Sequence, residues 1–262
     1  MTDLFYVIVL AALQGVAEFL PISSSGHLVL GRSLLGLGDV GLRLDVFLHV
    51  GTLVAVFAFY RATVARLVRG LFVAEKAARR AAWSFAGKLA LSSVPVGMAG
   101  LLFNDEIAEA TPRVVGAGLL VTGALLCATR VLPRGDRDVS WGRALVMGLA
   151  QALAIIPGIS RSGTTLAAAR AVRVEAEMSA EFSFLMSAPP IMGAALLEIL
   201  RAHDVAATPT PDVAWGLCAF GAVLAALVGY FALKLLVATL KSRAFWLFGP
   251  YCLVMGVLAL LI

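Results

Sequence analysis

The chain has 262 residues, of which 61% are hydrophobic and 14% are charged, and its mean hydropathy is +0.95. Soluble domains are about half apolar and about a quarter charged, so this composition excludes an ordinary soluble domain. The net charge of +5 does not indicate a nucleic-acid partner, because basic residues of membrane proteins gather in cytoplasmic loops.

Apolar runs of membrane-spanning length recur from one end of the chain to the other. They cover approximately residues 44–60, 89–103, 114–129, 183–200, 213–233 and 245–262. A helix needs about 20 apolar residues to cross ~30 Å of hydrocarbon, and the shorter runs lie near the lower limit. The sequence therefore predicts an all-α polytopic membrane protein surrounded by lipid.

The charge of the intervening stretches predicts their side of the membrane. Stretches rich in lysine and arginine are expected in the cytoplasm, and acidic or uncharged polar ones outside. The basic stretches are 61–88, 130–143 and 234–243, and the outer ones are 104–113 and 201–212. This count leaves 143–180 as a hairpin that enters from inside and returns. Residues 1–40 form either a hairpin from outside or a full pair of spans.

These two segments resemble each other. With Gln14 set over Gln151, the stretch QGVAEFLPISSSGHL lies without gaps over QALAIIPGISRSGTT. Each segment is followed by three apolar runs, and the two enter from opposite sides. We therefore predict an inverted-topology repeat within one membrane domain, 1–262, with repeat A at 1–130 and repeat B at 140–262. In such folds broken helices meet near the midplane and build a binding site.

Both segments contain helix breakers next to hydroxyl side chains. Pro21 and Gly26 interrupt the first, and Pro157, Gly158 and Gly163 interrupt the second. Serines can satisfy the backbone there, and free N–H groups at a helix start bind anions. A serine-rich kink that merely caps a helix is the simpler alternative.

The ionisable residues at the breaks favour phosphate chemistry. Glu18 follows Gln14 by four residues on one helical face, His27 follows the first break, and Arg161 occupies the second. An arginine with backbone N–H groups suits a phosphate, and a serine beside a histidine suits nucleophilic attack. Glu18 is also a candidate ligand for a divalent cation, Mg²⁺ or Ca²⁺.

The stretches QGVAEFLPISSSGH and PGISRSGTT resemble the two signature motifs of the bacterial undecaprenyl-pyrophosphate phosphatases of the BacA/UppP type. The first motif is an (E/Q)xxxE pair followed by PxSSxGH, and the second is PGxSRSxxT. The resemblance continues through AEFSFLMSAPPIMGA and covers essentially the whole chain.

This resemblance implies hydrolysis of undecaprenyl pyrophosphate to undecaprenyl phosphate and inorganic phosphate in the bacterial inner membrane, which recycles the lipid carrier for peptidoglycan synthesis. The principal functional positions it implies are Glu18, Ser24, His27 and Arg161, and the supporting ones are Gln14, Ser23, Ser160, Ser162 and Thr165. We also expect Ser25, Gly26 and Gly163 to contribute to substrate binding. Many members have Glu where this chain has Gln14, which weakens the case for a metal held by two carboxylates.

The resulting mechanistic hypothesis assigns one task to each principal residue. Ser24 attacks the terminal phosphorus, His27 accepts the serine proton, and Arg161 holds the phosphoryl oxygens. Glu18, with or without a divalent cation, neutralises the diphosphate or orients His27. His27 as the nucleophile is the rival assignment. Because the first hairpin carries most of the chemistry, we expect the site to open to the extracytoplasmic side.

Several further interpretations stay open. Asp45 and His49 are more simply an interfacial pair than a support for the site, and Pro189 with Pro190 predicts a kink in the fourth apolar run. A flippase or transporter of the lipid carrier is the alternative function. A lipid phosphatase of the PAP2 kind is disfavoured, because no HxxxD follows Arg161. The oligomeric state is not determined, and a homodimer is one option.

Overall fold

The computed structural model describes residues 2–34, 42–102, 111–193, 195–196, 213–242 and 244–262. Its α-helices are α1 (Thr2–Phe19), α2 (Ser24–Leu34), α3 (Leu42–Phe59), α4 (Arg61–Phe72), α5 (Lys76–Leu102), α7 (Pro112–Ala128), α8 (Trp141–Leu153), α9 (Arg161–Ala171), α10 (Ala176–Leu185), α12 (Trp215–Ser242) and α13 (Phe248–Leu260). Short 3₁₀ helices cover Thr129–Val131 and Ala244–Leu247. Within the described ranges no strand is formed, which confirms the all-α class.

The long apolar helices have the dimensions of membrane spans. The helical stretches 76–102, 112–131 and 215–242 are each long and apolar enough to cross a bilayer, and α3 with α4 makes a fourth candidate that bends by 78°. Their outer faces carry exposed apolar side chains such as Leu101, Val223 and Phe231. Exposed apolar side chains of this kind are compatible with contact with lipid hydrocarbon, so the polytopic membrane fold is confirmed.

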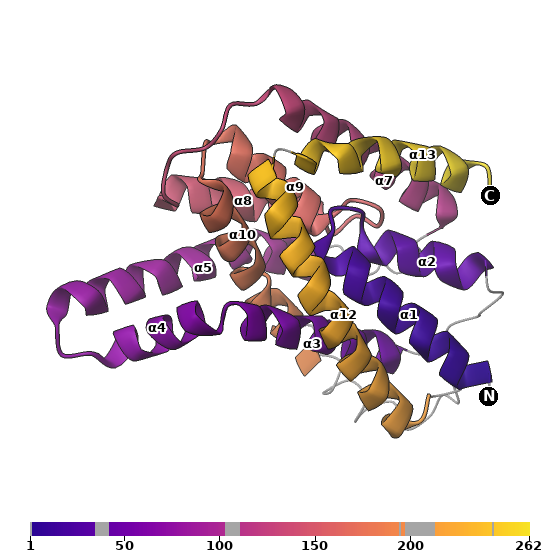
Figure 1. The fold of residues 1–262 in the computed structure, drawn as a ribbon, viewed down its shortest axis with the longest axis horizontal. Helices are drawn as coiled ribbons and strands as arrows, with labels where there is room; N and C mark the ends of the chain where they lie inside the picture. The colour runs from indigo at the N-terminus through magenta and orange to yellow at the C-terminus, as the bar shows by residue number, and fades with distance from the viewer. Residues whose placement is uncertain (1, 35–41, 103–110, 194, 197–212, 243) are drawn as a thin grey trace.

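Three boundaries differ from those expected. The basic stretch 61–88 is helical apart from a short turn, and α4 with the start of α5 projects from the body of the protein (Figure 1). Most of 234–243, expected as a loop, continues α12. The run 183–200 is interrupted, because α10 ends at Leu185 and the helix resumes at 188 after a turn. The expected outer stretch 201–212 lies outside the described residues, as does most of 104–113.

Both expected helix breaks are present, at Pro21 and at Pro157 with Gly158, but Gly26 and Gly163 do not interrupt a helix, because they lie in the first turns of α2 and α9. The chain leaves α1 at Phe19 and re-enters a helix at Ser24, and it leaves α8 at Leu153 and re-enters one at Arg161. In Figure 1, α1 and α2 lie side by side and the chain turns back toward its N-terminus. The first segment thus turns back at the break, which fits both the hairpin and the pair of spans that the sequence allows.

The first helix of each hairpin packs against a long helix from the other half of the chain. Helix α1 lies against α12, and α8 lies against α5, while α7 packs along α13. Large buried side chains, among them Phe19, Phe184 and Phe245, fill the core where these helices converge. The hairpin tips are therefore held inside the protein, although the division into repeats at 130 and 140 stays a prediction.

Close helix approach depends on glycines whose missing side chain leaves room for a neighbouring backbone. A Cβ atom at Gly51 of α3 would collide with the carbonyl group of Ala222 in α12. At Gly148 of α8 it would lie 2.5 Å from the carbonyl oxygen of Ser92 in α5. Small residues of this kind let helices associate in lipid, where no hydrophobic driving force brings them together.

We predict that Gly51→Ala lowers the thermal unfolding temperature in detergent by an amount equivalent to about 1–3 kcal/mol, because α3 and α12 must separate. The control is Gly97→Ala in α5, where a Cβ atom meets nothing within 4 Å. Alanine favours a helix over glycine by about 0.5–1 kcal/mol, so the control should be neutral or stabilising. Equal effects of the two changes would show that the contact does not limit packing.

Candidate active site

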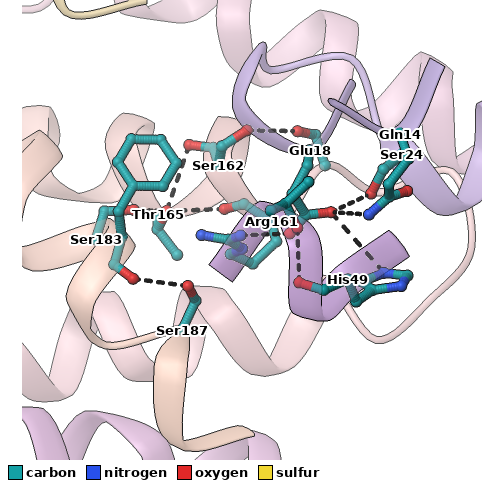
Figure 2. A network of polar contacts seen from close by, with 12 residues as sticks. Gln14, Glu18, Ser24, His49, Arg161, Ser162, Thr165, Ser183 and Ser187 are labelled. Atoms are coloured by element: carbon teal, nitrogen blue, oxygen red, sulfur yellow. Dashed lines mark hydrogen bonds and ion pairs between the residues drawn. The ribbon is translucent and has the colours of Figure 1, made fainter. Parts of the chain in front are cut away.

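The Glu18 carboxylate is the centre of a polar cluster between the two breaks (Figure 2). Its Oε2 atom accepts hydrogen bonds from the Ser24 hydroxyl at 2.7 Å and from the Gln14 side-chain amide at 3.0 Å. Its Oε1 atom accepts from Arg161 Nη2 at 2.6 Å. The Glu18 side chain is only 8% exposed, so burial and charge pairing act together here. The Glu18 carboxylate thus links Ser24 of the first hairpin to Arg161 of the second.

Local backbone geometry explains how Ser24 reaches Glu18. The residue before it, Ser23, adopts a positive φ of 69°, which turns the chain sharply at the end of α1. Its hydroxyl oxygen then accepts from the N–H of Gly26 at 3.2 Å and caps the start of α2. Ser24 is therefore the first residue of α2 and points back toward the last turn of α1.

The second break is built in the same way. The Ser160 hydroxyl oxygen accepts from the N–H of Gly163 at 3.1 Å, so that Arg161 is the first residue of α9. Thr122 of α7 fixes this break, because its hydroxyl donates to the carbonyl of Gly158 and accepts from the N–H of Ser160. Gly158 has a φ of 90°, which favours glycine.

The glycines expected to bind substrate lie where the two breaks touch. A Cβ atom on Gly26 would lie 3.2 Å from the Cα of Gly158, and one on Gly163 would lie 3.4 Å from the Cβ of Pro21. Neither Gly26 nor Gly163 lines the cavity described below. Their small size lets the two hairpins approach each other, and the substrate-binding role expected of them stays a prediction.

The other hydroxyl residues expected at the site connect its parts. The Ser162 hydroxyl donates to the carbonyl of Leu20 at 3.4 Å. The Thr165 hydroxyl donates to the carbonyl of Arg161 at 2.8 Å and lies 2.6 Å from the Ser183 hydroxyl of α10. All three hydroxyl groups belong to buried residues, so these contacts tie the second break to the first break and to α10.

The expected pairing of His27 with Ser24 is not observed. His27 Nδ1 lies 2.9 Å from the Ser23 carbonyl oxygen, and Nε2 lies 2.8 Å from the Tyr251 hydroxyl of α13. The two rings are stacked with their centroids 5.7 Å apart. The Ser24 hydroxyl donates to Glu18 instead. The reason is tertiary, because Tyr251 approaches α2 from a helix more than 220 residues away and engages the imidazole.

A cavity of about 200 Å³ opens beside the cluster. Its polar wall comprises Glu18, Ser23, Ser24, Ser25, His49, Gln151, Arg161 and Ser187, and its apolar wall includes Val96, Ile155, Ile159 and Ile191. The cavity therefore offers both charged or hydroxyl groups and hydrocarbon to a ligand. This distribution matches a ligand with a polar head and an apolar chain.

Three wall residues were not assigned to the site from the sequence. His49 Nε2 lies 3.9 Å from Glu18 Oε2, and its Nδ1 contacts the backbone carbonyl of Asp45. The Asp45 carboxylate pairs with Arg32, so the expected Asp45–His49 side-chain pair is wrong. Gln151 and Ser187 complete the group. Gln151 had a signal in its alignment with Gln14, and Ser187 had one in the resemblance that continues through AEFSFLMSAPPIMGA and in the kink predicted from Pro189 and Pro190.

Two polar atoms in the cluster lack a hydrogen-bond partner within the described part of the chain. Arg161 Nη1 and Gln14 Oε1 are both buried and have no hydrogen-bond partner among the residues that the structure describes. The first is a cationic donor and the second is a neutral acceptor next to a carboxylate. The guanidinium also lies over the Phe184 ring, 5.5 Å from its centroid. The site can thus receive an anion at Arg161 and has oxygen atoms for a cation at Gln14 and Glu18.

Comparisons with known proteins identify the family of this chain. A family model described as "Bacitracin resistance protein BacA" matches residues 7–258. The chain belongs to the BacA family. It is 40% identical to an undecaprenyl-diphosphatase of Desulfatibacillum aliphaticivorans, over 95% of each chain. It is 36% identical to one from Methanosphaera stadtmanae, over 100% of this chain and 99% of the relative. One from Halothermothrix orenii is 38% identical, over 99% and 98%.

From the ion pair between Glu18 and Arg161 we predict how substitution of either residue changes the unfolding temperature. Removing one partner leaves a buried charge without compensation, which typically costs about 3–5 kcal/mol. Glu18→Met and Arg161→Met should therefore each lower the unfolding temperature in detergent, and the double variant should recover most of the loss. The coupling energy from this double-mutant cycle is the measurement. Additive losses would contradict a direct buried pair.

Proposed function

We propose that this membrane protein hydrolyses undecaprenyl diphosphate to undecaprenyl phosphate and inorganic phosphate. The observation that carries the proposal is the Ser24 hydroxyl, which donates to a buried carboxylate held by Arg161 inside a partly apolar cavity. The printed names of the relatives agree with it. The product would return to peptidoglycan synthesis as a lipid carrier.

The proposed first step is attack by Ser24 on the terminal phosphorus. A bond forms between Ser24 Oγ and phosphorus while the bond from phosphorus to the bridging oxygen breaks. Glu18 accepts the serine proton, because its Oε2 already accepts that hydrogen bond at 2.7 Å. The same proton can then pass to the bridging oxygen, so that undecaprenyl phosphate leaves and Glu18 is again a carboxylate.

The proposed second step hydrolyses the phosphoserine. Glu18 takes a proton from water as the water oxygen bonds to phosphorus, and the bond between phosphorus and Ser24 Oγ breaks. The proton then returns to Ser24, and inorganic phosphate is released. In both steps Arg161 Nη1 donates to a phosphoryl oxygen, where negative charge is greatest.

This mechanism gives His27 a positioning role in place of the proton transfer inferred from the sequence. One ring nitrogen contacts the Ser23 carbonyl and the other contacts Tyr251. Because Ser23 holds the positive φ that turns the chain, its contact with His27 stabilises the break. The imidazole thus fixes the direction of Ser24 without touching it.

A divalent cation, Mg²⁺ or Ca²⁺, stays part of the proposal. The structure describes no group of three or more His, Cys, Asp or Glu side chains able to hold a metal. The unpartnered Gln14 Oε1 beside Glu18 nevertheless fits a hard cation, which also takes waters and substrate phosphates as ligands. Gln14 and Glu18 would hold such a cation, and when bound it would neutralise part of the diphosphate charge.

We further propose that the protein lies in the bacterial cytoplasmic membrane with its cavity opening to the extracytoplasmic side. The basic residues of α4 and the start of α5, including Arg66, Arg69 and Arg79, favour the cytoplasm for the projecting end of the protein. A homodimer stays an open alternative. So does a flippase activity, which needs no phosphate release.

Phosphate release from purified protein in detergent tests the proposed reaction. Undecaprenyl diphosphate should yield inorganic phosphate with wild-type protein, and Ser24→Ala should reduce the rate at least about 10³-fold, because the nucleophile is lost. EDTA should lower the rate, and added Mg²⁺ or Ca²⁺ should restore it.

Ser92→Ala is the matched control for this measurement. Ser92 is equally a serine near the core, but its hydroxyl donates to the carbonyl of Leu89 and it does not line the cavity. The rate of phosphate release by Ser92→Ala should stay within about twofold of wild type, because the change removes a hydroxyl group that is not part of the cavity wall. Failure of wild-type protein to release phosphate would favour the flippase, and an active Ser24→Ala variant would exclude that serine as nucleophile.

A second comparison identifies the base. Glu18→Gln should lower kcat by about 10²–10⁴-fold, because an amide cannot accept the serine proton. His27→Gln should cost about tenfold or less, because the glutamine can still donate to the Ser23 carbonyl. Both rates are measured by phosphate release with saturating substrate. A larger loss for His27→Gln than for Glu18→Gln would assign the proton transfer to the imidazole.

A further inference from the structure

Gln151 is a buried polar residue that lines the cavity beside Glu18. It lies in the last turn of α8 and is 2% exposed. Neither its amide nitrogen nor its amide oxygen has a hydrogen-bond partner among the described residues. Buried side-chain amides almost always have at least one partner, so an amide with two unsatisfied atoms needs an explanation.

The position of Gln151 supplies that explanation. Its side chain lines the cavity that also contains Glu18, Ser24 and Arg161. Arg161 Nη1 is the other unpartnered donor in the same wall. Within the described part of the chain, one nitrogen of the Arg161 guanidinium and the amide nitrogen of Gln151 are thus buried donors without partners, and both residues line one cavity of about 200 Å³. A ligand with several acceptor oxygens would satisfy both.

Gln14 and Gln151 differ in whether their side-chain amides find a partner within their own helix. The two residues occupy matching positions in the gapless alignment of the hairpins. The amide of Gln14 donates to Glu18, four residues further along α1. The residue four places after Gln151 is Ile155, whose side chain has no polar atom. The same amide therefore has an intrahelical partner in the first hairpin and lacks one in the second.

We propose that Gln151 is a substrate-binding residue that donates from its side-chain amide to a phosphoryl oxygen of the diphosphate. This inference rests on the proposed function. Glu18 and Arg161 already balance each other's charge, so a bound diphosphate adds negative charge that needs further donors. An amide supplies one without a second cation that would compete for Glu18. Its oxygen can accept from a water molecule or a phosphate hydroxyl in the cavity.

The test compares two variants of Gln151 by steady-state phosphate release from undecaprenyl diphosphate and by thermal unfolding in detergent. Gln151→Leu removes the donor at similar volume and should raise KM about tenfold or more, with kcat changed less than about threefold. Its unfolding temperature should not fall, because two unsatisfied polar atoms are removed from the interior. Gln151→Glu places a carboxylate near the anionic substrate and should raise KM further than Gln151→Leu.

Tyr60→Phe is the matched control. The Tyr60 hydroxyl is also buried without a partner among the described residues, but Tyr60 does not line the cavity. Its removal should leave KM and kcat unchanged and should not lower the unfolding temperature. This control separates the effect of removing any unpartnered buried atom from the effect of removing one at the site.

Each other outcome contradicts the proposal in a distinct way. An unchanged KM for Gln151→Leu would show that the amide does not contact substrate. A loss of kcat together with a lower unfolding temperature would make Gln151 a structural residue. A KM for Gln151→Glu at or below the wild-type value would indicate that the side chain faces a cation. If wild-type protein and Tyr60→Phe both released no phosphate, the proposed function itself would fail.

Discussion

The buried ion pair between Glu18 and Arg161 is the interaction on which the site depends. It joins the last turn of α1 to the first residue of α9, which are 143 positions apart in the chain. A carboxylate on an apolar helix is costly in a membrane, and so is a guanidinium, unless each has a partner. Neither hairpin can therefore hold its charged residue alone. The requirement to pair these charges places the two breaks against each other and, with them, Ser24 against Glu18.

Contact between the breaks is reciprocal. Gly26, in the first turn of α2, lies against Gly158 of the second break, and Gly163, in the first turn of α9, lies against Pro21 of the first break. In the gapless alignment Gly26 matches Gly163, and Pro21 matches Gly158. A contact in which each half offers the same two positions to the other is what a two-fold axis through the breaks produces. This pattern supports the proposed inverted repeat at the point where the site is formed.

The spans and breaks could be predicted because they depend on local composition, whereas the partner of His27 could not, because it comes from a distant helix. Serine, glycine and proline indicated where α1 and α8 end. The stretch 61–88 was expected as a loop because its charge lowers hydropathy, although its many alanine, leucine and arginine residues favour a helix. His27 was assigned to Ser24 from their proximity in sequence, but Tyr251 from α13 binds the imidazole. No local pattern contains that partner.

The two hairpins share their helix caps but differ at two aligned positions, and this difference produces one reaction site instead of two. The caps are alike, since Ser23 and Ser160 accept from the third residue ahead at 3.2 and 3.1 Å. The residues that carry charge or react differ, because Glu18 aligns with Ile155 and Ser24 aligns with Arg161. A symmetric pair would place two carboxylates or two arginines at the axis, where like charges repel at close range. Divergence at these two positions lets one half supply the nucleophile and its base while the other supplies the cation.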